Sequence, residues 1–240
     1  MVETPTTKAY QPRIVRGRIE IWTPHSNGEI AFASPAVGPA NYINTGKQIL
    51  DSNQQVPTGD YTSSLLHSAY CSDAKNEPEF GNVRDLMRTN WLWIFNRNLW
   101  TENGVYVLQD TNATGRSQPL DEKDLEKMLK GGKDIFGISF SKDGKLRFAP
   151  KGNYVLGNHT PESLAKDGFI IASNGLEGAE KLGEVSAKFR NTPFVYGVEV
   201  QEGKASEQRV SAVDEDGGRL GFYGYNWSGN YDCHAFGVWK

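Results

Sequence analysis

Hydrophobic residues alternate with polar ones, or recur at helical spacing, along most of the chain, and this pattern predicts a mixture of strands and helices. In the segment 14–22, Ile19 and Ile21 alternate with charged neighbours, which indicates a strand with one buried face. The segment 23–55 is rich in Pro, Gly, Asn and Ser, so loops and short strands are expected there. Residues 1–12 lack the apolar content needed for packing, and we expect a disordered N-terminal arm.

Helices are expected where a start signal precedes an apolar stripe. Asp60 and Asp121 are suited to N-caps, and Pro78 and Pro161 are suited to first helical turns. The helix at Pro161 is expected to be only one to two turns long. A further helix is expected near 177–189, where apolar residues recur at core spacing.

Pairs of β-prone segments flank short turns that contain glycine, which is typical of β-hairpins. The pairs are 91–95 with 105–108, 135–141 with 145–149, and 209–213 with 219–223. Further strands are expected over 169–172, 194–200 and 235–239. The sequence therefore predicts an α+β fold, with a mostly antiparallel sheet built from hairpins, about four helices packed on it, and a βαβ-like unit over 169–200.

Length and composition are those of one globular domain over residues 13–240, and a sub-domain boundary would lie in the loop and charged helix of 111–134. A chain of 240 residues with 38% hydrophobic residues can bury a core without disulfides or metal. With 26 basic and 29 acidic residues there is no basic excess, so nucleic acid is not an expected partner. Neither a signal sequence nor a membrane span is expected, and two cysteines are too few for a disulfide framework, which predicts a cytoplasmic protein.

The cysteines and their neighbouring histidines form one candidate site. His67 and Cys71 are four residues apart on an expected helix and project from one face, while Cys233 and His234 are adjacent. These four residues are zinc ligands by type, although adjacent residues of a strand point to opposite faces. They also suit a hydrolase in which Cys71 or Cys233 is the nucleophile, His67 or His234 the base, and Asp232 an orienting group. In the alternative interpretation both thiols are small buried hydrophobic groups. Apart from zinc, no cofactor is expected.

A glycine-containing junction between an expected strand and helix forms a second candidate. Gly175 and Gly178 would let backbone N–H groups approach a phosphate at the N-terminus of the helix. Glu177, between them, adds a negative charge that opposes a phosphate. A tight turn followed by a helix start explains both glycines equally well.

Aromatic residues interleaved with Gly, Ser and Asn near the C-terminus form the third candidate. The residues are Tyr223, Tyr225, Asn226, Trp227 and Tyr231. Flat rings with small hydrogen-bonding neighbours suit a recognition surface for a sugar, a base or another protein. Because a β-rich C-terminus also needs aromatic residues for its core, we expect some of these rings to be buried.

We interpret the chain as a ligand- or partner-binding protein, of a small molecule, a sugar or a protein, that lacks a recognisable catalytic motif. The Cys/His hydrolase and nucleotide or phosphate binding at Gly175 and Gly178 are the alternatives, so whether the protein is an enzyme stays open. An oligomer, with the aromatic residues in a subunit interface, is a further alternative.

Overall fold

The fold is that of a computed structural model, which describes residues 10–15, 20–26, 28–226, 229–230 and 232–239. Its helices are α1 (Tyr42–Asp51), α2 (Gly59–Cys71), α3 (Pro78–Thr89), α4 (Glu122–Leu129), α5 (Pro161–Ala165) and α6 (Gly168–Ser186). Its strands are β1 (Arg13–Val15), β2 (Glu20–His25), β3 (Gly28–Ala33), β4 (Val37–Ala40), β5 (Trp91–Thr101), β6 (Gly104–Gln109), β7 (Lys133–Ile135), β8 (Ile138–Phe140), β9 (Leu146–Pro150), β10 (Gly157–Asn158), β11 (Phe194–Tyr196), β12 (Glu207–Asp216), β13 (Arg219–Asn226) and β14 (Cys233–Ala235).

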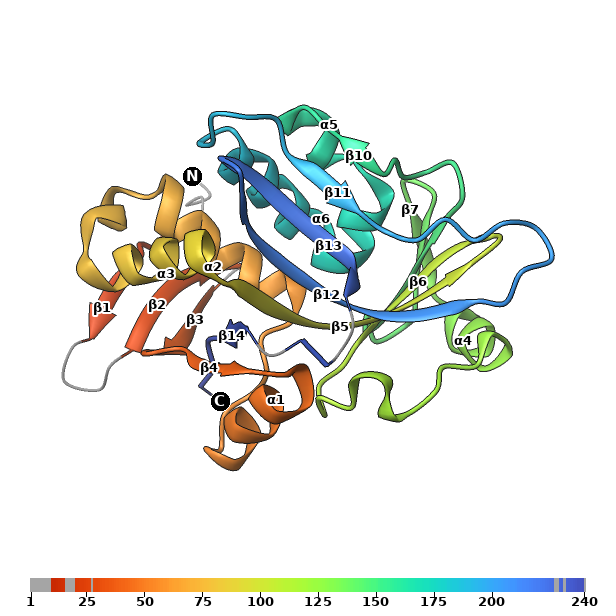
Figure 1. The fold of residues 1–240 in the computed structure, drawn as a ribbon, viewed down its shortest axis with the longest axis horizontal. Coiled ribbons are helices and arrows are strands. Elements are labelled where there is room, and N and C mark those ends of the chain that lie inside the picture. The colour runs from red at the N-terminus through yellow and green to blue at the C-terminus, as the bar shows by residue number, and fades with distance from the viewer. Residues whose placement is uncertain (1–9, 16–19, 27, 227–228, 231, 240) are drawn as a thin grey trace, which may run out of the picture.

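A large, mostly antiparallel sheet crosses the middle of the molecule (Figure 1) in the strand order β10-β11-β13-β12-β5-β6-β9-β8-β7. The pairs β5–β6, β8–β9 and β12–β13 are the three hairpins that the turn signals predict. Two pairings are parallel, β11 with β13 and β14 with β5. The predicted α+β fold class is therefore confirmed.

Side chains alternate between the two faces of β5, and this alternation divides the core. Leu92 and Ile94 belong to the cluster that also contains buried residues of α2, α3 and α6. Trp93 and Phe95 belong to a second cluster, on the other face, with buried residues of α1 and β14. Helix α4 packs Leu125 into a third cluster with residues of β5, β6 and β9. The central strands of the main sheet are thus covered on both faces.

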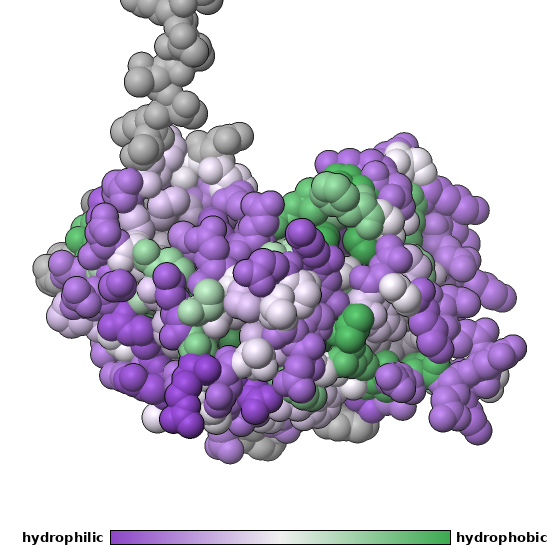
Figure 2. Space-filling view, turned by 90° about the horizontal axis from the view of Figure 1, so that it is seen from above, coloured by the Kyte–Doolittle hydropathy of each residue, from purple (hydrophilic) through white to green (hydrophobic). Residues whose placement is uncertain are grey.

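A small antiparallel sheet, β1-β2-β3, packs beside α2 and contributes Ile21 and Phe32 to the first cluster. The end of the chain runs along this sheet, because Val238 forms bridges with both Phe32 and Gln55. None of the helices in the described part of the chain is both long enough and apolar enough to cross a membrane. In the view of Figure 2, hydrophilic residues dominate the surface and hydrophobic residues gather in small separate groups.

The strand predicted over 169–172 is wrong, because these residues form the first turn of α6. The Asp167 carboxylate caps the helix by accepting hydrogen bonds from the backbone N–H groups of Phe169 (3.0 Å) and Ile170 (3.1 Å). A short, continuously apolar run is compatible with a buried helix as well as with a buried strand. The βαβ-like unit over 169–200 is therefore also wrong.

Three other local predictions need correction. The segment 14–22 contains parts of two antiparallel strands, β1 and β2, rather than one strand. The loop-rich segment 23–55 contains helix α1, which Asn41 caps by accepting a hydrogen bond from the Asn44 N–H at 2.8 Å. Thr58 rather than Asp60 is the N-cap of α2, and the Asp60 carboxylate instead pairs with Arg147. Most of the predicted N-terminal arm, residues 1–9, lies outside the described residues.

Candidate functional site

Aromatic side chains from three strands gather on one face of the main sheet. Alternation along β13 turns Phe222 inward, against Phe169 of α6, and turns Tyr223 and Tyr225 to the opposite face. Tyr196 of β11 lies beside Tyr223, because β11 and β13 are paired in parallel with these two residues in register. Together with their neighbours they form what we call the aromatic face: Trp91, Phe194, Tyr196, Tyr223 and Tyr225.

The rings of the aromatic face contact one another in a row. Tyr196 and Tyr223 are stacked, with ring centroids 4.5 Å apart and planes only 2° from parallel. Trp91 stacks on Tyr223 at 5.1 Å, and Tyr225 meets both Tyr223 and Tyr196 edge-on at 5.9 and 5.8 Å. Such contacts fix ring orientation, so the row presents a preformed surface.

Two carboxylates of β12 border this row. The Tyr196 hydroxyl donates a hydrogen bond of 2.8 Å to Asp216. Burial raises the pKa of Asp214 to about 7, although the adjacent Tyr223 hydroxyl and Trp91 side chain act in the opposite direction. The Asp214 carboxyl group therefore exchanges its proton near neutral pH, at the centre of the aromatic face.

A pocket of about 370 Å³ opens beside Trp91 and Asp214. Its other lining residues come from the end of α3, the turn after it, and the segment before β14: Met87, Arg88, Thr89, Asn90, Asn230, Asp232 and Cys233. Asn90 spans its two walls, because the Asn90 side-chain amide donates a hydrogen bond of 3.3 Å to the Asp232 carbonyl oxygen. The pocket thus joins the aromatic face to the C-terminal segment.

The structure brings part of the predicted aromatic site together. Tyr223 is almost fully buried in the ring row, whereas Tyr225 is half-buried. Asn226 is buried, and its side-chain NH2 group has no hydrogen-bond partner among the described residues. Trp227 and Tyr231 lie outside the described residues.

Three residues of this candidate site that the sequence did not assign to it are Trp91, Tyr196 and Asp214. Each sits in a segment whose apolar or turn-forming character was recognised, but nothing local indicates that the three meet. The parallel register of β11 on β13 and the antiparallel register of β12 on β5 bring them together. Alternation with the core residues Leu92, Val195 and Val213 predicts that all three lie on the opposite face of the sheet.

The two Cys/His pairs lie in different core clusters. Cys71 packs against the first cluster, whereas Cys233 is fully buried in the second, on the opposite face of the sheet. Neither Cys233 with His67 nor Cys71 with His234 is brought together, and the four residues do not surround a common point. Burial raises the pKa of the Cys233 thiol and lowers the pKa of His234, so both are held neutral. The face of α2 that carries His67 and Cys71 instead lies against Glu184 of α6.

Gly175 and Gly178 lie at a kink within α6 rather than between a strand and a helix. Gly175 has φ 71° and ψ 173°, a backbone conformation that interrupts the helix. Glycine adopts this conformation more readily than other residues, because it has no Cβ atom. Glu177 occupies the adjacent space, where its carboxylate accepts a 3.1 Å hydrogen bond from the Ser26 N–H and pairs with Lys181 at 2.7 Å. A phosphate at this kink would meet that carboxylate, and the kink is explained by chain geometry.

The pH dependence of stability should change when Asp214 is replaced by asparagine. Its folded pKa lies above the value of about 3.9 for an unfolded chain. The stability that the protonated group contributes is therefore complete below about pH 4 and is lost as the pH rises through about 7. In urea unfolding, the wild-type protein should lose more stability than Asp214→Asn between about pH 5 and pH 8. The exposed substitution Asp51→Asn is the control, and identical pH dependence in all three proteins would contradict the assignment.

Comparison with known proteins assigns neither a family nor a function to the chain. No family model matches the chain, and no curated protein sequence matches it. A solved structure described by the words "Accommodation of massive sequence variation in Nanoarchaeota by the C-type lectin fold" is similar at 11% sequence identity, with a TM-score of 0.44. That similarity covers 83% of this chain and 92% of the other. At this level it shows neither a family nor a function, and the functional argument rests on the geometry of the chain.

Proposed function

We propose that the protein is a recognition protein that binds a basic segment of a protein partner on the aromatic face and the C-terminal segment beside it. The observation that carries the proposal is the row of stacked rings from three strands, which leads into a polar pocket. Rigid aromatic rings supply large contact area at a small cost in conformational entropy. Gly229 and Asn230, which follow β13, belong to the small residue types that accompany such rings in binding loops.

Charge favours a basic partner. Asp216 borders the ring row and Asp232 lines the pocket, and Asp214 adds a negative charge only in the fraction that is ionised near neutral pH, because its pKa is about 7. Arg219 already holds its guanidinium 5.9 Å from the centre of the Phe194 ring, so this edge of the face accommodates a cation over an aromatic ring. Lys or Arg side chains of a partner would meet rings and carboxylates beside Tyr196 and Asp216, whereas Arg219 at the Phe194 edge and Arg88 in the pocket oppose them.

Selection of peptides from a random library on the immobilised full chain tests this proposal. We expect peptides enriched in Lys and Arg, and we expect Tyr225→Ala to weaken their binding by about tenfold or more, as for a central aromatic contact. Phe136→Ala is the matched control, because Phe136 is an aromatic residue that is 81% exposed in the β7–β8 turn, at the far edge of the sheet.

Two outcomes would contradict the proposal. Selected peptides could bind wild type and Tyr225→Ala equally well, which would place recognition elsewhere on the molecule. Alternatively, a panel of oligosaccharides could bind in a Tyr225-dependent manner while no peptide is enriched, which would assign the aromatic face to sugars.

A further inference from the structure

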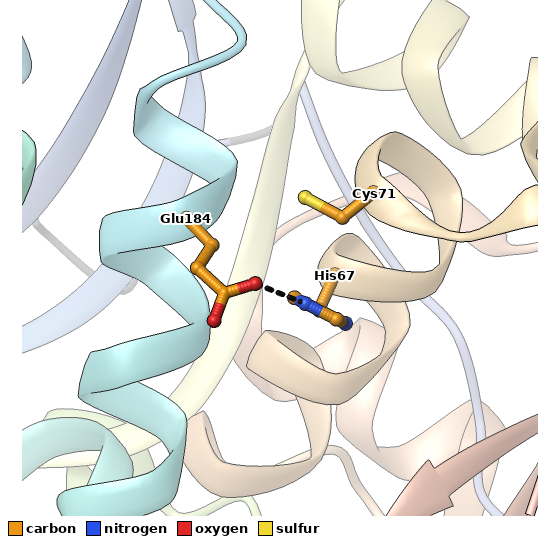
Figure 3. A group of neighbouring side chains, drawn as sticks. All are labelled: His67, Cys71 and Glu184. Carbon is orange, nitrogen blue, oxygen red and sulfur yellow. Dashed lines mark hydrogen bonds and ion pairs between the residues drawn. The ribbon is translucent and has the colours of Figure 1, made fainter.

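His67, Cys71 and Glu184 converge on one space between α2 and α6 (Figure 3). The His67 Nε2 atom and a Glu184 carboxylate oxygen are 2.8 Å apart. One ligand atom from each of the three residues, including the Cys71 sulfur, lies within 4.8 Å of the other two. His67 and Cys71 are half-buried, and Glu184 is exposed, so the space is open to solvent on one side.

Contacts along the helix pair hold these residues in register. The Ser63 hydroxyl lies 3.2 Å from the Asn174 side-chain oxygen, and Lys181 donates a 2.9 Å hydrogen bond to the Ser64 hydroxyl. The helices also approach closely at Gly178, where an added Cβ would lie 3.3 Å from the Ser63 hydroxyl oxygen. His67 and Glu184 continue this series one turn further along. The three candidate ligands are therefore carried by rigid elements rather than by loops.

From this geometry we infer a zinc site formed by His67 Nε2, Cys71 Sγ and the Glu184 carboxylate, with water as the fourth ligand. All three are donor types that Zn²⁺ takes in four-coordinate sites. Ligand distances of about 2.0–2.3 Å require donor atoms about 3.5 Å apart, so the widest separation must close by about 1 Å. Because the Glu184 side chain is 66% exposed, rotation about its own bonds can adjust the position of its carboxylate, and the side chains of His67 and Cys71 must supply any closure between those two ligands.

The orientation of His67 favours an ion over a thiol nucleophile. In a nucleophile–base–carboxylate relay, the imidazole uses one nitrogen for the nucleophile and the other for the carboxylate. Here Nε2 faces the Glu184 carboxylate, and Figure 3 shows the Cys71 sulfur above the ring, which is seen nearly edge-on, rather than beyond the other ring nitrogen. Zinc binding would displace the thiol proton to solvent and leave a Zn–thiolate bond.

The charges around the site are mixed. Lys188 and Lys75 lie close enough to Cys71 to act on its ionisation, and they oppose a cation. The Cys71 thiolate and the Glu184 carboxylate together offset the charge of a divalent ion. Among the described residues, the site lies apart from the aromatic face, since α2 and α6 cover the other face of the sheet. The inference is therefore independent of the proposed function.

Titration of the metal-free chain with Co²⁺ and Zn²⁺ tests the inference. We expect one equivalent of Co²⁺ to bind with a sulfur-to-cobalt charge-transfer band and the intense visible bands of tetrahedral cobalt, and one equivalent of Zn²⁺ to displace it. Cys71→Ser should abolish the charge-transfer band, and Glu184→Gln should weaken binding at least tenfold. Glu180→Gln, which removes an exposed carboxylate one turn earlier on α6, should leave binding unchanged.

Thiol alkylation of the wild-type protein tests the same inference without depending on whether a variant folds. Cys71 is the partly exposed thiol and Cys233 is fully buried, so alkylation of the native protein reports on Cys71. Zinc should slow this alkylation at least tenfold, and a chelator should restore it. Unchanged alkylation in the presence of zinc, or a cobalt spectrum without a sulfur band, would overturn the inference.

Discussion

Phe169→Ala is expected to lower the free energy of unfolding by about 3–5 kcal/mol, the range found for large aromatic residues truncated in a packed core. Phe169 is fully buried at the start of α6, and its ring lies 4.8 Å from the Trp100 ring and 5.6 Å from the Phe222 ring. Gly224 marks how tight this packing is, because an added Cβ there would lie 2.3 Å from the Phe169 ring. Removal of the ring therefore leaves a cavity that the backbone of β13 cannot readily fill.

Urea unfolding of the purified variant measures this effect. Phe136→Ala is again the control, since truncation of an exposed ring should change stability by less than about 0.5 kcal/mol. A loss of less than about 1 kcal/mol for Phe169→Ala would mean that α6 does not pack its first turn onto the sheet as described.

Asp60→Ala is expected to destabilise the protein by about 2–4 kcal/mol, because it leaves the Arg147 guanidinium buried without its charge partner. The two carboxylate oxygens of Asp60 accept hydrogen bonds from Arg147 Nη1 (3.0 Å) and Nη2 (2.8 Å), in a bidentate pair. The Arg147 side chain is only 7% exposed, and it donates further to the Ala172 carbonyl oxygen at 3.3 Å. One guanidinium thus links β9 to α2 and α6. The Asp60 side chain is 25% exposed, so we place the expected loss below the largest values known for buried pairs.

A double variant separates the charge effect from packing. Asp60→Leu combined with Arg147→Met replaces the pair by apolar groups and should recover much of the stability that Asp60→Ala loses. Asp85→Ala breaks the exposed pair with Arg88 on α3 and should cost less than about 1 kcal/mol. Equal losses for Asp60→Ala and Asp85→Ala would contradict the account of Arg147.

Local signals predicted much of the fold. The Asn-Gly and Asp-Gly turns located hairpins, and Pro78 and Asp121 located the starts of α3 and α4. The prediction failed where local signals are ambiguous. The apolar run from Phe169 to Ala172 has no periodicity that separates a helix from a strand, and its Asp167 cap went unrecognised.

Helix α1 escaped prediction because glycine within a helix is a weak helix former. Gly46 sits in α1 where the chain packs closely, since an added Cβ would lie 2.1 Å from the Ala113 side chain and 2.7 Å from the Phe95 ring. The close packing of α1 therefore requires glycine at position 46, although glycine disfavours a helix when the sequence is considered alone.

The candidate sites depend on contacts between distant segments. Tyr223 and Tyr225 were recognisable from the sequence, but the parallel pairing that brings Tyr196 onto Tyr223 joins residues with no local relation. In the same way, His67 and Cys71 were recognisable as a pair on one helix face, whereas Glu184 reaches them only because α6 packs along α2. Side-chain types and spacing indicate the residues of each site that lie close together in the sequence. Only the fold shows which residues from distant segments join them.

The most direct test of the central claim is to map where a selected basic peptide contacts the protein. Hydroxyl-radical labelling, read by mass spectrometry with and without the peptide, reports the solvent access of individual aromatic side chains. We predict that the bound peptide protects Tyr196 and Tyr225 and leaves Phe136 as accessible as in the free protein. Protection of Phe136, or unchanged labelling of both tyrosines, would contradict recognition on the aromatic face.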